Sequence, residues 1–125
     1  MYKLLTTIAI LCFSVYANAD VYVCTEKAGG LAWVDGRNPG TLSGSGPNFV
    51  GDTWVIDTEK GMRHSNDKEF SGSCITDFKV ICRYISQNNS ERVFEINPFS
   101  EGIIFTAHNR NIMSVYAYAG ACIKT

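Results

Sequence analysis

Charged side chains are scarce in this sequence, and their two signs nearly cancel. Only 18% of the 125 residues are Asp, Glu, Lys or Arg, and the formal net charge is −1. Proteins that bind nucleic acid gain much of their affinity from positive charge that faces the phosphates. The composition therefore argues against a nucleic-acid-binding protein, and it implies no strongly acidic partner.

Long regular patterns are also missing. No segment of ten or more residues repeats its apolar side chains at the helical period, so we expect an all-β chain. The main apolar run, from Leu4 to Val15, is shorter than the about 20 residues that cross a bilayer. Hydrophobic residues still make up 46% of the chain, which is enough for one buried core and excludes a disordered protein.

That apolar run belongs to a segment with the three parts of a secretion signal. Lys3 supplies the positive charge, Leu4 to Val15 form the apolar core, and Ala17-Asn18-Ala19 place small residues before a cleavage site. We predict cleavage before Asp20, so that residues 1–19 are a signal peptide and residues 20–125 form a single domain. The short signal with its Ala-x-Ala end is typical of bacteria. It predicts a periplasmic or secreted protein that is not inserted in the membrane after cleavage.

Four of the five cysteines remain in the predicted mature chain, and an even number in an exported protein indicates disulfides. No two of them have the two to four intervening residues typical of a tetrahedral thiolate site, so we predict no metal and no cofactor. Four cysteines allow three connectivities. If the first and last strands are neighbours, Cys24 pairs with Cys122 and Cys74 pairs with Cys82.

Short runs of alternating apolar and polar residues, rich in β-branched and aromatic side chains, recur along the mature chain and predict strands. Turn residues separate them, with predicted turns at 28–30 and 108–111 and a long loop at 38–51. We predict a small antiparallel meander barrel or sandwich of seven to eight strands, linked by disulfides. The predicted strands are 21–25, 31–34, 53–57, 62–64, 78–84, 92–96, 103–107 and a long last strand, 112–124, that Gly120 bends.

No catalytic motif is recognisable. His64 and His108 are the only histidines, and each lies in a polar stretch that we interpret as a solvated turn or short edge strand. Four paired cysteines leave no free thiolate as a nucleophile. We therefore predict that the protein is not an enzyme.

Loop 38–51 is the longest predicted loop, and its small residues suit contact with a partner held in place by a rigid scaffold. We predict a non-catalytic binding protein of the bacterial envelope, with an envelope or secreted protein as its partner. The candidate contact residues are Ser43, Gly44, Ser45 and Gly46.

A second hypothesis uses the aromatic side chains, most of which fall at inward positions of the predicted strands. An eight-stranded barrel has room for one small ligand. In this alternative the protein carries a small apolar ligand in a barrel interior lined by Trp33, Trp54 and Phe94.

Three features together resemble a set of small exported proteins from Proteobacteria and their phages. They are Val21-Tyr22-Val23-Cys24 after the cleavage site, the central pair Cys74 and Cys82, and the closing Gly120-x-Cys122-x-Lys124. This resemblance implies no activity for any residue of this chain. Ser43-Gly44-Ser45-Gly46 is also similar to the Ser- and Gly-containing inhibitory loop of the periplasmic lysozyme inhibitors, which are small β-barrels with a cysteine link. The second resemblance implies inhibition of a hydrolase such as lysozyme.

Overall fold

The computed structural model describes residues 19–33, 35–37, 39–43, 50–98 and 103–125, and these residues form strands, bridges and turns without a helix. The predicted all-β class is confirmed. The strands are β1 (Val21–Trp33), β2 (Gly40–Thr41), β3 (Thr53–Asp57), β4 (Gly61–His64), β5 (Ser73–Thr76), β6 (Val80–Ile85), β7 (Glu91–Asn97), β8 (Ile103–Arg110) and β9 (Ser114–Lys124).

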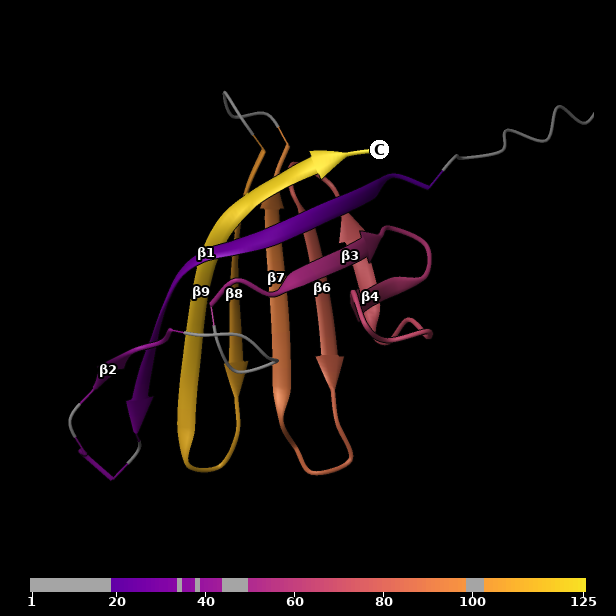
Figure 1. Cartoon of the computed structure of the whole chain (residues 1–125). Helices are drawn as coiled ribbons and strands as arrows, with labels where there is room; N and C mark the ends of the chain where they lie inside the picture. The colour runs from indigo at the N-terminus through magenta and orange to yellow at the C-terminus, as the bar shows by residue number, and fades with distance from the viewer. Residues whose placement is uncertain (1–18, 34, 38, 44–49, 99–102) are drawn as a thin grey trace, which may run out of the picture.

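All strand pairs are antiparallel and belong to one sheet with the order β4-β3-β1-β9-β8-β7-β6-β5, while β2 pairs with β1. Strands β5 to β9 follow one another as a meander, and β1 then closes against β9. In Figure 1, β1 and β9 lie side by side and β3 crosses β6 and β7. Backbone hydrogen bonds between Met62 and Ser71, of 2.9 and 2.8 Å, join β4 to the segment before β5. The sheet is therefore a nearly closed barrel.

Register explains which side chains meet inside the barrel, because residues paired across neighbouring strands point to the same face. Two rows cross β6, β7, β8, β9 and β1 and are largely buried, whereas a third row nearer the hairpin turns is partly exposed. The buried rows are Val80, Ile96, Phe105, Gly120 and Glu26, and Cys82, Phe94, Ala107, Tyr118 and Gly29; the third row is Tyr84, Arg92, Asn109, Tyr116 and Leu31.

Both predicted disulfides are present. Cys24–Cys122 links directly opposed residues of β1 and β9, and Cys74–Cys82 links opposed residues of β5 and β6. The pairing of β1 with β9 also confirms the prediction that the first and last strands are neighbours. Structural disulfides persist in oxidising compartments, so this pair indicates a location outside the cytosol.

Membrane-spanning helices are not found in the part of the chain that the structure describes.

Strand β1 is longer than predicted, because residues 28–30 do not form a turn but continue the strand. A bulge between Glu26 and Ala28 shifts the register with β9, and Gly120 lies opposite Glu26 at that point. A Cβ atom on Gly120 would lie 2.0 Å from the Thr25 carbonyl oxygen. The absence of a side chain at Gly120 thus lets β9 pass close to β1 as it curves.

Three further local predictions need correction. Strand β5 was not expected, and β2 lies within the predicted loop. Phe78, predicted to face inward, lies in the bend before β6 and is 80% exposed. His108 lies within β8 and not in a turn, because the Asn111 side chain accepts hydrogen bonds from the Met113 and Ser114 N–H groups, both at 2.8 Å, and places the turn after residue 110.

Candidate functional site

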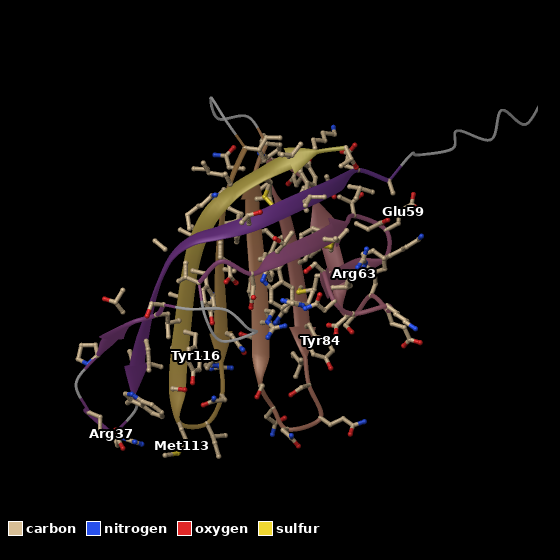
Figure 2. The ribbon with its side chains drawn as sticks, viewed as in Figure 1. Arg37, Glu59, Arg63, Tyr84, Met113 and Tyr116 are labelled. Atoms are coloured by element: carbon tan, nitrogen blue, oxygen red, sulfur yellow. A yellow bond between two sulfur atoms is a disulfide. The ribbon has the colours of Figure 1, made fainter. Side chains whose placement is uncertain are left out.

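The partly exposed row at the hairpin end of the barrel forms a cleft. Tyr84 on β6 pairs in register with Arg92 on β7, and Arg92 pairs with Asn109 on β8. Figure 2 shows Tyr84 and Tyr116 on β6 and β9, to either side of β7 and β8. The cleft has a volume of about 270 Å³, and its lining residues are Tyr84, Ser86, Ser90, Arg92 and Asn109. We call it the Arg92 cleft.

Among the described residues, Arg92 is the only charged one that lines this cleft. Its guanidinium carbon lies 4.3 Å from the centroid of the Trp54 ring, which is a cation–π contact. Among the described residues, no hydrogen-bond acceptor and no carboxylate is paired with the Arg92 guanidinium. Burial lowers the pKa of Arg92 below its ordinary value, because desolvation disfavours the charged form.

Trp54 connects Arg92 to a buried carboxyl group. The Trp54 indole Nε1–H donates a hydrogen bond of 2.9 Å to Glu26 Oε1. Glu26 is only 2% exposed, and its Oε2 has no hydrogen-bond partner within the described ranges. Burial raises the pKa of Glu26 to about 7, although the Trp54 hydrogen bond acts in the opposite direction. Glu26 therefore changes its charge near neutral pH.

Tyr118 lies beside this group in the neighbouring row. It is 7% exposed, and its hydroxyl is buried without a hydrogen-bond partner in the described part of the chain. Burial raises the pKa of Tyr118, and the charge of Glu26 raises it further. Below the Arg92 cleft, the interior thus holds two side-chain oxygens, Glu26 Oε2 and the Tyr118 hydroxyl, that have no hydrogen-bond partner among the described residues.

The alternation of β1 explains how Glu26 reaches the interior. Tyr22, Cys24 and Glu26 are successive inward residues, and the bulge follows Glu26 directly. The Glu26 backbone N–H donates to the Asp52 carbonyl at 3.0 Å, which holds this end of the regular strand against the segment before β3. Sequence reasoning missed Glu26 because the predicted strand ended at residue 25, although the alternation, continued by one step, places it on the face of Cys24.

His64 lies near a carboxylate, which differs from the solvated position expected for it. Its Nε2 is 3.5 Å from Asp52 Oδ1, and both side chains are nearly buried. His64 Nδ1 accepts a hydrogen bond of 3.2 Å from the Asn66 N–H, and the ring meets Trp54 edge-on. His64 Nδ1 is therefore occupied by the Asn66 N–H, whereas Nε2 makes no hydrogen bond with a described residue.

His108 is the other histidine, and its side chain is 46% exposed. Its Nε2 is 3.9 Å from Glu91 Oε1. Glu91 also pairs with Arg83, and these contacts lower the pKa of the Glu91 carboxyl. His108 therefore belongs to a charged cluster across β6, β7 and β8.

The four predicted contact residues are only partly described. Ser43 is exposed after β2, while Gly44, Ser45 and Gly46 lie outside the described residues. The three residues predicted to line an apolar cavity do not share one. Trp54 and Phe94 pack together in the core at 5.2 Å between ring centroids, whereas Trp33 is outside the buried core and lies under Arg37. The space beside Trp54 and Phe94 is too small to admit even a water molecule, whereas small-ligand sites begin at about 300 Å³.

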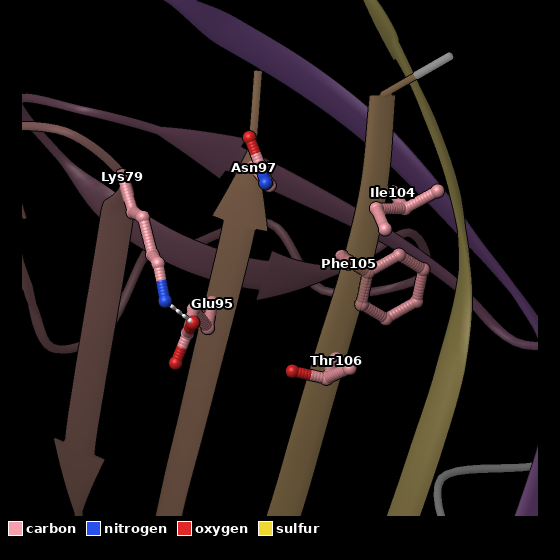
Figure 3. A pocket seen from close by; sticks show the side chains of 6 residues that line it. All are labelled: Lys79, Glu95, Asn97, Ile104, Phe105 and Thr106. Atoms are coloured by element: carbon pink, nitrogen blue, oxygen red, sulfur yellow. Dashed lines mark hydrogen bonds and ion pairs between the residues drawn. The ribbon is translucent and has the colours of Figure 1, made fainter. Parts of the chain in front are cut away.

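A second hollow, of about 140 Å³, lies over β7 and β8 (Figure 3). Its two charged residues, Lys79 and Glu95, form an ion pair with each other. Unlike the Arg92 cleft, this hollow presents a charge that already has its partner.

The Arg92 cleft can therefore bind a polar group. Comparisons with protein-family models, with curated proteins and with solved structures find no match for this chain.

Proposed function

We propose that this chain is an exported, non-catalytic binding protein whose ligand places a polar group in the Arg92 cleft. One observation carries the proposal: the Arg92 guanidinium lies over Trp54 in an open cleft, without a hydrogen-bonding partner among the described residues. A partly buried charge that lacks a partner costs free energy. A ligand that pairs with Arg92 would recover part of that cost on binding.

Binding without catalysis is supported by the groups around the cleft. Its lining side chains are hydroxyls, an amide, a phenol and a guanidinium. His64 uses one ring nitrogen for the Asn66 N–H and has the other 3.5 Å from Asp52 Oδ1. Such an arrangement favours holding a ligand over transferring its protons.

Signal cleavage before Asp20 and export of the mature chain are supported by the contacts that Asp20 makes. The Asp20 N–H donates to Thr58 Oγ1 at 2.9 Å, and the Asp20 carbonyl accepts from the Thr58 N–H at 3.0 Å. The Asp20 carboxylate pairs with Lys124 at 3.0 Å. These contacts anchor the first residue of the proposed mature chain, in line with cleavage before Asp20 and delivery to the periplasm or the medium.

We also propose a hydrolase such as lysozyme as a protein partner, which contacts loop 38–51 separately from the ligand of the Arg92 cleft. The resemblance of Ser43-Gly44-Ser45-Gly46 to an inhibitory loop supports it. The loop leads from β2 back toward β3, so its ends are held by strands that pair with β1.

The experiment is native mass spectrometry of the mature protein after incubation with an envelope extract of its own host. The wild type should retain one ligand or partner per chain. Ser90→Trp, which fills the mouth of the Arg92 cleft from an accessible turn, should lose it. Ala119→Trp, on the exposed face of β9, is the matched control and should retain it.

Two results would contradict the proposal. One is a wild-type protein that emerges without any bound species. The other is a Ser90→Trp protein that binds as well as the Ala119→Trp control, which would place the contact elsewhere.

A further inference from the structure

We infer that the group held in the Arg92 cleft is an anion, either a carboxylate or a phosphate, carried by a small molecule. This inference rests on the proposed function and names the chemistry of its ligand. It is drawn from three properties of the cleft: the donors that line it, the missing internal counter-ion, and its size.

Hydrogen-bond donors dominate the lining. Arg92 presents five N–H groups, and the Tyr84, Ser86 and Ser90 hydroxyls and the Asn109 amide add further donors. Ser86 Oγ accepts a hydrogen bond of 3.2 Å from the Ser90 N–H, so its own hydrogen remains available to donate. Asp and Glu do not occur among the lining residues. Such a set matches a group that only accepts.

Glu26 is the nearest candidate for an internal counter-ion, and its geometry does not make it one. Glu26 Oε1 accepts from the edge of the Trp54 indole, whereas Arg92 lies over the face of that ring. No Arg92 nitrogen comes within ion-pair distance of a carboxylate in the described ranges. Burial is the main influence on the pKa of Arg92 and lowers it, while the charges of Tyr118, Glu26 and Asp67 raise it without ion-pair contact. Burial raises the pKa of Glu26 to about 7, so the Glu26 carboxyl is uncharged in mildly acid solution and its share of this compensation is then lost.

The position of Arg92 also suits a bidentate acceptor, which offers two oxygens side by side. A guanidinium that lies over an aromatic ring keeps its in-plane N–H groups free. Two of these groups can bind the two oxygens of a carboxylate or a phosphate in parallel. Trp54 thus acts as a platform that orients Arg92 toward the cleft.

The cleft volume limits the size of the ligand. The volume of about 270 Å³ lies just below the about 300 Å³ at which small-molecule sites begin, so only a small ligand or part of one fits. A single acidic sugar or a comparable small acid fits this space. Suitable probes are therefore glucuronate as the carboxylate, glucose 6-phosphate as the phosphate, and glucose as the neutral control.

Trp54 provides the readout, because the chain has only two tryptophans. In a Trp33→Phe background, Trp54 is the single indole and lies in contact with Arg92. Titration of this protein with each probe, followed by fluorescence and by calorimetry, gives the dissociation constants. We expect at least one acid to bind at least tenfold more tightly than glucose, and the tighter of the two acids to identify the carboxylate or the phosphate as the source.

Charge variants then locate the binding. Arg92→Gln should weaken acid binding at least tenfold, as expected for loss of a hydrogen bond to a charged group. Arg110→Gln removes the same charge from β8, where Arg110 faces Glu91, and should bind as the wild type does. Ser90→Glu places a carboxylate at the cleft mouth and should abolish acid binding, whereas Ser90→Gln should retain it. The two Ser90 variants change a turn residue, so they still test the inference if Arg92→Gln fails to fold.

The inference is overturned if no acid binds more tightly than glucose, if Arg110→Gln loses as much affinity as Arg92→Gln, or if Ser90→Glu binds as Ser90→Gln does. The proposed function is tested separately by Ser90→Trp and the natural ligand. If Ser90→Trp fails to bind the natural ligand but Arg92→Gln still binds it, the proposed binding cleft stands and only the inference of an anionic ligand is refuted.

Discussion

The buried carboxyl of Glu26 makes stability depend on pH in a direction opposite to that of most carboxylates. Its pKa rises from the ordinary value of 4.5 to about 7 in the folded protein, with burial as the main cause. Between these two values the folded chain holds a proton that the unfolded chain has lost. Stability is therefore fully present below pH 4.5 and declines as the pH rises through about 7.

The size of the effect follows from the two pKa values. Each pH unit between them removes up to about 1.4 kcal/mol, so the whole interval removes about 3 kcal/mol of unfolding free energy. The perturbation is Glu26→Gln, which keeps an acceptor for the Trp54 indole but cannot ionise. The variant should lose this part of the pH dependence.

Urea unfolding of both proteins at several pH values gives the measurement. Groups whose ionisation does not depend on the charge of Glu26 contribute equally to both curves and cancel in their difference. We expect the wild type to lose about 3 kcal/mol relative to Glu26→Gln between about pH 4 and about pH 8. A difference that stays constant over this range would refute the assignment of Glu26 as a buried acid with a raised pKa.

Three further perturbations test the fold and the proposed target. Replacing Cys24 and Cys122 by Ala should cost about 4–5 kcal/mol of unfolding free energy and replacing Cys74 and Cys82 about 2–3, since the links span 98 and 8 residues; equal losses in urea unfolding would contradict the loop-closure argument. Gly120→Ala should destabilise by about 3 kcal/mol or more, because its Cβ would meet the Thr25 carbonyl, whereas Gly40→Ala, with open space around it, should change the melting temperature little. Deleting residues 43–46 should abolish a complex with lysozyme in a cell-wall clearance assay and leave the melting temperature nearly unchanged, and equal inhibition by the deleted protein would dismiss the loop.

Much of the barrel could be predicted from local patterns. The alternation around Val80 and Cys82 and that around Phe94 and Ile96 identified the central strands, because one face of each is buried. The cysteine pairing followed from the expectation that the first and last strands are neighbours. These features depend on short-range periodicity and on the expectation that a closing meander places its first strand beside its last.

The parts that failed depend on contacts between distant segments. Gly29 and Gly30 were interpreted as a turn, yet both lie in β1. A Cβ atom on Gly29 would lie 2.9 Å from Val50 Cγ2 and 3.0 Å from the Tyr118 ring, so packing by distant residues explains this glycine. Strand β5 has four residues, mostly exposed, and pairs only with β6 among the named strands, so it carries little hydrophobic pattern.

The candidate site was missed for a similar reason. From the sequence, Arg92 is the polar start of a strand, and only the register across three strands places it beside Tyr84 and Asn109. The contact between Arg92 and Trp54 joins residues from opposite walls of the barrel. An alternating sequence indicates which face a residue occupies, but not whether another strand covers that face.

The central claim is that a ligand enters the cleft where Arg92 lies over Trp54. The most direct measurement is the indole N–H region of a two-dimensional NMR spectrum, recorded before and after addition of host envelope extract. Only Trp33 and Trp54 contribute signals there, and Trp33→Phe assigns them. The account predicts that the Trp54 signal shifts while the Trp33 signal stays in place. A spectrum in which Trp54 is unchanged, although the protein has bound a component of the extract, would contradict it.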